Sequence, residues 1–210
     1  MNPDKLNFVI RCDSSLSIGN GHIMRCSTLA RQFLKRFSAN IFVLYKELDE
    51  NIITRLREDF FLINLATKKE ELKKKHLIND VTLKNKNEEE DAQLCIEALS
   101  KKNIKNINLL IVDHYSLSIL WENYFSSKWG KKRLNKLMVI DDLANREHYC
   151  DILLDQTFNR RSADYRGLIP KGSLLLLGSE YALIRDDFLE ARKQNIFKKS
   201  LKKKSPIKLL

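Results

Sequence analysis

The sequence lacks the runs and motifs that mark several large classes of protein. It has no stretch of about 18 apolar residues, so we expect no transmembrane helix. It has no G-x-x-x-x-G-K-[ST] phosphate loop, which argues against an ATPase or kinase. It has no G-x-S-x-G elbow, so Ser14, Ser15 and Ser17 are not expected to supply a nucleophile. The N-terminus has no basic segment followed by a long apolar one, and we expect no signal peptide.

Cysteine is scarce and widely spaced. The four cysteines, Cys12, Cys26, Cys95 and Cys150, form no CxxC pair. No cluster of thiolates and imidazoles with the spacing of a zinc site is visible. We therefore expect small buried thiols in a cytoplasmic protein, and no metal or other cofactor.

Positive charge is distributed unevenly along the chain. The net charge is +11, but residues 191–210 carry eight basic side chains and no acid, which leaves +3 for the first 190 residues. The charge is not interleaved with aromatic residues as in nucleic-acid-binding segments. The lysines of the Lys/Asn-rich segment 67–90 are typical of a solvated surface. We expect no nucleic-acid partner and no insertion into a membrane.

Short apolar runs alternate with longer amphipathic segments. The strand-like runs are continuously apolar, which favours a parallel sheet covered on both faces by crossover helices. The predicted fold class is α/β, a Rossmann-like parallel sheet with flanking helices, over residues 1–193, followed by a basic segment over 194–210. The expected strands are 6–12, 41–45, 61–65, 109–113, 136–142, 150–155 and 173–178. The expected helices are 22–36, 50–60, 91–102, 116–129 and 186–193.

Polar side chains follow several of these strands. The carboxyl ends of parallel strands share one edge of a sheet, and open α/β sheets bind ligands there. The residues gathered at this edge are Asp13, His22, Asp113, His114, Tyr115, Asp141, Asp142 and Asn159. Other roles stay open, because an Asp at a strand end also caps helices and anchors loops. Paired acids suit magnesium, but the sequence places no third ligand beside Asp141 and Asp142, so capping is the preferred interpretation.

The segment SIGNGHIMRC, residues 17–26, is the most informative of these loops. It places Gly19 and Gly21, two of only 6 glycines, just before His22 at an expected helix start. Glycine permits close backbone approach, and a helix N-terminus offers N–H groups to an anionic or polar ligand. The helix dipole disfavours a cationic histidine, so a neutral His22 is a candidate general base. The alternative is a polar residue at a loop–helix junction.

Five segments, taken in order, resemble the PseG family, the UDP-sugar hydrolases of pseudaminic acid biosynthesis. They are RCDSSLSIGNGHIMRCSTLA, LLIVDHYSLS, VIDDLANREHYCDILLDQTFN, DYRGL and LLGSEYALIRDDF. The resemblance covers nearly all of residues 6–193 outside 67–88. It implies a two-domain fold like that of GT-B glycosyltransferases, of which this chain is similar to the N-terminal domain. It also implies release of UDP, without a metal, by attack of water on the anomeric carbon of the sugar.

The resemblance also implies roles for particular residues. His22 matches the proposed base that activates the water, and Tyr115 matches a tyrosine that shapes the substrate site. Gly19, Gly21 and Asp13 match the loop around the sugar and its phosphates. With the strand-end residues and two further matches, the expected substrate-binding set is Asp13, Gly19, Gly21, Asp113, His114, Tyr115, Asp142, Asn159 and Tyr165.

The chain departs from the family pattern after residue 193. Family members continue into a second Rossmann-like domain that supplies a Gly-rich loop and most contacts to the UDP. Here the sequence ends on PIKLL, which resembles the start of that domain's first strand. We expect an N-terminal half with a mobile segment 194–210, and a nucleotide sugar and a separate C-terminal half as its partners. Two alternatives stay open: half of a GT-B-like sugar-nucleotide glycosyltransferase, and a non-catalytic truncated remnant.

Overall fold

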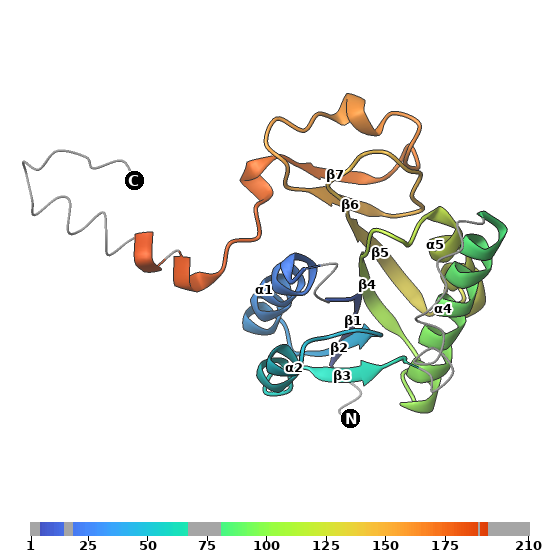
Figure 1. The fold of residues 1–210 in the computed structure, drawn as a ribbon, viewed down its shortest axis with the longest axis horizontal. Helices are drawn as coiled ribbons and strands as arrows, with labels where there is room; N and C mark the ends of the chain where they lie inside the picture. Colours follow the sequence, from blue (N-terminus) through green and yellow to red (C-terminus); the bar gives the residue numbers. More distant parts are fainter. Residues whose placement is uncertain (1–4, 15–18, 67–80, 189, 193–210) are drawn as a thin grey trace, which may run out of the picture.

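A computed structural model places seven strands in one sheet in which every neighbouring pair is parallel (Figure 1). The structure describes residues 5–14, 19–66, 81–188 and 190–192. The strands are β1 (Leu6–Cys12), β2 (Ala39–Tyr45), β3 (Phe61–Asn64), β4 (Ile107–Asp113), β5 (Leu134–Ile140), β6 (Ile152–Asp155) and β7 (Leu174–Leu177). The helices are α1 (Gly21–Arg36), α2 (Glu50–Leu56), α4 (Val81–Lys101) and α5 (Ile119–Trp129), with 3₁₀ turns at Ser162–Tyr165 and Ser179–Tyr181. The predicted Rossmann-like α/β class is confirmed.

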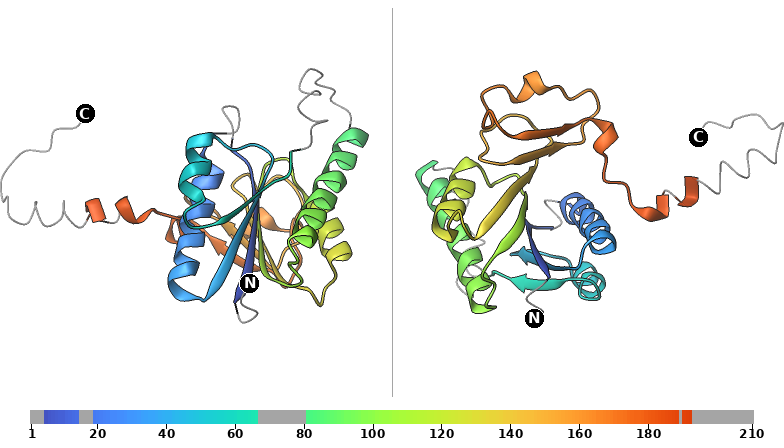
Figure 2. Two further views of the ribbon diagram at one scale, coloured as in Figure 1. Left: turned by 90° about the horizontal axis from the view of Figure 1, so that it is seen from below. Right: turned by 180° about the vertical axis from the view of Figure 1, so that it is seen from behind.

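Helices cover both faces of the sheet, as Figure 2 shows. Helices α1 and α2 (blue and teal) lie on one face, and α4 and α5 (green to yellow) lie on the other. Side chains alternate along each strand between these two layers. In β1, Val9 packs in the core cluster with α4 and α5, whereas Phe8 and Ile10 pack in the cluster with α1 and α2. All residues of β2 are buried. This burial on two sides is the physical reason for the continuous apolar runs in the sequence.

Several helix and strand ends differ from the ranges expected from the sequence. Helix α5 begins after Ser118, whose hydroxyl accepts a hydrogen bond from the N–H of Leu120 at 3.3 Å. Strand β5 ends at Ile140 rather than at residue 142 because the chain turns, and the carboxylate of Asp141 accepts the N–H of Ala144 at 2.9 Å. Helix α4 begins at Val81, well before the expected residue 91. Side-chain capping and turn bonds therefore set boundaries that apolar periodicity does not mark.

The last described residues return to α1. Residues 186–188 and 190–192 are helical, where a helix over 186–193 was expected. Asp186 accepts hydrogen bonds from Gln32 at 3.2 Å and Lys35 at 2.6 Å on α1. The basic segment 194–210 and residues 67–80 of the Lys/Asn-rich segment lie outside the described residues. All four cysteines are buried free thiols, as expected. No helix in the described ranges is both long and apolar enough to cross a bilayer.

The strand order creates a switch point between β1 and β4. The order is β3-β2-β1-β4-β5-β6-β7, so the chain leaves β1 towards β2 on one side and later adds β4 on the other. Cys12 at the end of β1 pairs with Asp113 at the end of β4. The loops that follow these two strands diverge, and in open α/β sheets ligands bind in such a crevice.

Candidate functional site

The central feature at the switch point is a histidine–aspartate pair. His22 is the second residue of α1, and its Nδ1 lies 2.5 Å from Oδ1 of Asp113 at the end of β4. His22 is 5% exposed and Asp113 is 0% exposed. An ionised carboxylate only accepts hydrogen bonds, so Nδ1 of His22 carries a proton in this contact. Within the described residues no hydrogen bond occupies Nε2, which leaves a lone pair suited to accept a proton.

Asp113 also binds Arg25, which lies one helical turn after His22 on α1. Arg25 donates from Nε to Oδ2 and from Nη2 to Oδ1, both at 2.6 Å. Burial raises the pKa of Asp113, but the hydrogen bonds from Arg25 and His22 and the charge of Arg25 outweigh it, so the pKa lies below its ordinary value. Asp113 is therefore a fixed anion that orients both neighbours.

Tyr115 and Asp142 complete this side of the site. The rings of His22 and Tyr115 meet edge to face, with centroids 4.5 Å apart. Tyr115 donates its hydroxyl to Oδ2 of Asp142 at 3.1 Å, and Nη1 of Arg25 donates to the same oxygen at 3.0 Å. Tyr115 is 45% exposed, so it borders solvent beside the buried histidine. The structure thus brings together four residues expected at the site: His22, Asp113, Tyr115 and Asp142.

Asp13 ties together the loops after β1, β2 and β4. Its Oδ1 accepts the backbone N–H of Lys46 at 2.7 Å, and its Oδ2 lies 3.1 Å from Nε2 of His114. Arg11 places Nη1 2.8 Å from Oδ1. Burial raises the pKa of Asp13, but the charge of Arg11 and the hydrogen bond from His114 overcome it and hold that pKa far below its ordinary range. Asp13 and His114 therefore bind each other and fix loop positions.

The two glycines of the first loop differ in what they contribute. Gly19 has φ +79°, a left-handed conformation that favours glycine. Gly21 is the exposed first residue of α1, and a Cβ atom there would meet no atom of the described residues within 4 Å. The first turn of α1 contains no acidic residue. The helix therefore presents its positive end to the switch point without a built-in counter-charge.

Asn159 and Tyr165 lie apart from this group. Asn159 is exposed in the loop after β6, with φ +61°. Tyr165 is only 1% exposed, and its hydroxyl bonds Asp141 at 2.9 Å and Asp155 at 2.7 Å. The carboxylates of Asp141 and Asp142 therefore bind different partners and do not converge. The hydroxyl of Tyr165 joins two buried acids instead of facing solvent.

Arg25 is the functional candidate that sequence reasoning missed. Its partners Asp113 and Asp142 are distant in sequence, and only the fold brings them together. A signal was nevertheless present: His22 and Arg25 are three residues apart, a spacing that places two side chains on the same face of a helix. Arg160 was also missed; it donates to the backbone oxygen of Asp142 at 2.8 Å.

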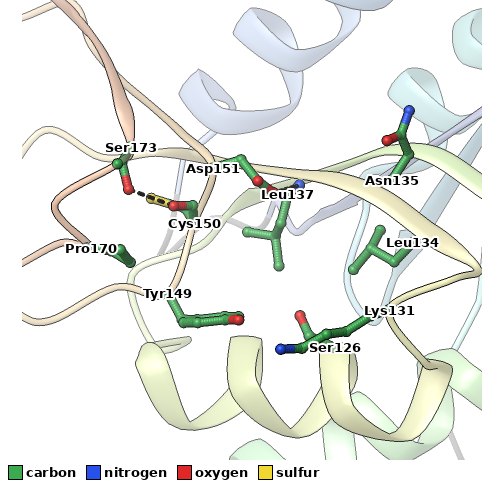
Figure 3. Close-up of a pocket in the computed structure, with 11 residues that line it drawn as sticks. Ser126, Lys131, Leu134, Asn135, Leu137, Tyr149, Cys150, Asp151, Pro170 and Ser173 are labelled. Carbon is green, nitrogen blue, oxygen red and sulfur yellow. Dashed lines mark hydrogen bonds between the residues drawn. The ribbon is translucent and has the colours of Figure 1, made fainter.

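A hollow of about 380 Å³ lies at the opposite edge of the sheet (Figure 3). It is formed at the amino ends of β5, β6 and β7, where Tyr149, Ser173 and Leu134 line it. None of the expected site residues borders this hollow. The candidate chemistry and the hollow are therefore separate features of the domain.

Comparison with known proteins supports the resemblance seen in the motifs. No family model matches the chain. The chain is 28% identical over 194 residues to the UDP-2,4-diacetamido-2,4,6-trideoxy-beta-L-altropyranose hydrolase of Campylobacter jejuni. The aligned region covers 92% of this chain and 57% of that relative, so the chain spans little more than half of the relative's length. The chain is similar to the N-terminal half of a PseG-type hydrolase.

Proposed function

We propose that this chain carries the water-activating part of a nucleotide-sugar hydrolase, which releases UDP and a free 2,4-diacetamido-2,4,6-trideoxy sugar for pseudaminic acid biosynthesis. The observation that carries the proposal is His22, held by Asp113 through Nδ1 at 2.5 Å, with no hydrogen bond to Nε2 from the described residues. The similarity to a hydrolase named for such a substrate supports the choice of UDP sugar.

The reaction needs one base and a site for a departing anion. Nε2 of His22 takes a proton from water while the water oxygen bonds to the anomeric carbon of the sugar. The bond from that carbon to the β-phosphate oxygen breaks, and its electron pair leaves with UDP. A nucleoside diphosphate is a good leaving group, so little acid assistance is required. N–H groups at the start of α1 are suited to stabilise developing negative charge.

Release of UDP from the diacetamido sugar nucleotide tests the proposal. The chain is assayed alone and mixed with a polypeptide that corresponds to the remainder of the Campylobacter relative, because the chain spans only 57% of that protein. A general base contributes about 100-fold to 10,000-fold, so His22→Asn is expected to lower the rate by at least about 100-fold. Arg31→Gln is the control, since Arg31 lies on the same helix and pairs with Asp59 at 2.8 Å.

The position of attack is tested in ¹⁸O-labelled water. The proposal predicts label in the sugar, whereas label in UDP would show attack at phosphorus. A His22→Asn variant as active as the wild type would remove His22 from the mechanism. If sugar passes to an added acceptor in preference to water, the glycosyltransferase alternative is supported instead. No UDP release under either assay condition would support the non-catalytic alternative.

A further inference from the structure

The carboxylate of Asp113 is contacted by both His22 and Arg25. Oδ1 of Asp113 lies 2.5 Å from Nδ1 of His22 and 2.6 Å from Nη2 of Arg25. Nε of Arg25 takes the other oxygen, Oδ2, at 2.6 Å, so the guanidinium grips both oxygens of the carboxylate. Nη2 of Arg25 also lies 3.2 Å from Nδ1 of His22. The imidazole and the guanidinium therefore share a single fully buried anion.

A buried anion needs a positive counter-charge. If His22 were the only neighbour of Asp113, a doubly protonated imidazole would best satisfy it, and such a ring has no lone pair with which to accept a proton. Arg25 is permanently charged and supplies the positive counter-charge of Asp113 in place of the imidazole. We infer that Arg25 is a positioning residue that supplies the counter-charge of Asp113 and so keeps His22 neutral, with its proton on Nδ1 and its lone pair on Nε2.

Two further neighbours of Arg25 and Asp113 are Asp142, a second and partly exposed carboxylate, and the buried thiol of Cys26. Asp142 is the second anchor of Arg25, at 3.0 Å from Nη1, and it also accepts the hydroxyl of Tyr115. Cys26 donates its thiol to Oδ2 of Asp113 at 3.4 Å, and the interaction with Cys12 together with burial raises the pKa of the Cys26 thiol, so it stays neutral. Arg25 is thus held at both ends, with a side chain only 11% exposed.

The side chain of lysine would reproduce the charge of Arg25 but not its geometry. The guanidinium uses three nitrogens to bridge two carboxylates. An ammonium is a single point of charge without that planar fork. Arg25→Lys is therefore expected to keep His22 neutral while holding Asp113 less firmly, and Arg25→Gln to remove the counter-charge altogether.

The test reads the protonation of His22 directly by the ¹⁵N chemical shifts of its imidazole in histidine-labelled protein at pH 7. His22→Asn assigns the signal. The wild type is expected to show a neutral ring protonated on Nδ1, and Arg25→Gln a substantial share of doubly protonated ring. Arg25→Lys is expected to retain the neutral ring, and the control Arg31→Gln to match the wild type. Arg25→Met is a second charge-removing variant, which fills the same space should the glutamine variant not fold.

The inference is overturned if His22 keeps the neutral signature in a folded charge-removing variant, or if the ring becomes doubly protonated in Arg25→Lys. In the UDP-release assay, Arg25→Gln is expected to lower kcat by about tenfold or more with little change in KM, because the base and not the binding surface is altered. The inference rests on His22 acting as the base. Full activity of His22→Asn would refute that role and leave the ¹⁵N result standing, so the two failures are distinguishable.

Discussion

Replacing Asp113 by asparagine removes the charge on which the candidate site is built. Asp113 is 0% exposed and accepts hydrogen bonds from His22, from two nitrogens of Arg25 and from the thiol of Cys26. An amide offers one oxygen where the carboxylate offered two, and its NH₂ group faces other donors. Among the described residues, Asp142 then remains as the one acidic partner of Arg25.

The structure sets the size of the expected loss. Removing one partner of a buried ion pair costs about 3–5 kcal/mol, because the other charge is left uncompensated. Arg25 keeps its bond to Asp142 at 3.0 Å, so we expect the lower end of that range, about 3 kcal/mol. For a domain of this size about 1 kcal/mol shifts Tm by roughly 2–4 °C, which gives a fall of about 6–12 °C.

The pH dependence of the same variant has a definite sign. Burial raises the pKa of Asp113, but the hydrogen bonds and charge of its partners lower that pKa by a larger amount. The pKa in the folded state therefore lies below the unfolded value, which is about 4. A depressed carboxyl pKa contributes stability that is fully present above the unfolded value and is lost as pH falls through the folded value. The gap in unfolding free energy between wild type and Asp113→Asn should therefore narrow below about pH 4.

Urea unfolding at pH 7 and at acidic pH measures both effects. A double-mutant cycle with Arg25→Gln isolates the pair, and we expect the two losses to be non-additive by about 1 kcal/mol or more. Asp59→Asn is the matched control, because Asp59 pairs with Arg31, which lies on α1 like Arg25. The side chain of Asp59 is 38% exposed, so this substitution should lower the unfolding free energy by no more than about 1 kcal/mol. A loss under about 1 kcal/mol for Asp113→Asn, or additivity within about 0.5 kcal/mol in the cycle, would refute the reasoning.

Two further predictions concern buried acids outside the His22 pair. Burial raises the pKa of Asp91, but the charge and hydrogen bonds of Arg11 prevail and bring that pKa to about 2. Asp91→Asn should therefore lower the unfolding free energy at pH 7 and flatten its decline between about pH 4 and 2, and an unchanged acid slope in urea titrations would contradict this. The hydroxyl of Tyr165 serves Asp141 and Asp155, so Tyr165→Phe should cost about 2 kcal/mol, seen as a lower melting temperature. A melt within about 1 °C of the wild type would show that the hydroxyl is dispensable.

The positions of the strands and their parallel arrangement were predictable because the central strands of the sheet are buried on both faces. Apolar runs lie within each strand, and the structure places all seven strands in one parallel sheet. The position of His22 at a helix start was predictable from the glycines before it. The ends of helices and strands were less predictable, because each depends on a single hydrogen bond. Examples are the bond to the hydroxyl of Ser118 at the start of α5 and the bond to the carboxylate of Asp141 after β5. The pairing of His22 with Asp113 depends on the strand order, which no local pattern encodes.

Alternation along the strands explains how the expected site residues divide between the two layers. Ile111 of β4 and Ile140 of β5 pack on the α1 side of the sheet. Because side chains alternate between the two faces, residues two or four positions after these isoleucines lie on the α1 side, and the residues in between lie on the side of α4 and α5. The group bonded to or packed against α1 residues is Asp113, Tyr115 and Asp142, around His22. The group on the other side is Asp13, His114, Asp141 and Tyr165.

This division gives the two groups different physical tasks. Asp13 belongs to the same face as Arg11, whose guanidinium binds Asp91 of α4 at 2.8 Å. Asp141 binds Tyr165, which packs in the core cluster of α4 and α5. Asp13 and Asp141 therefore have partners for their negative charge within the domain, and their role is to hold loops in position. The acids on the α1 side are shared between Arg25, Tyr115 and His22, next to the N-terminus of a helix that carries no acid in its first turn. His22 and the N-terminus of α1 lie together on that face, which is why two neighbouring acids such as Asp141 and Asp142 are not interchangeable here.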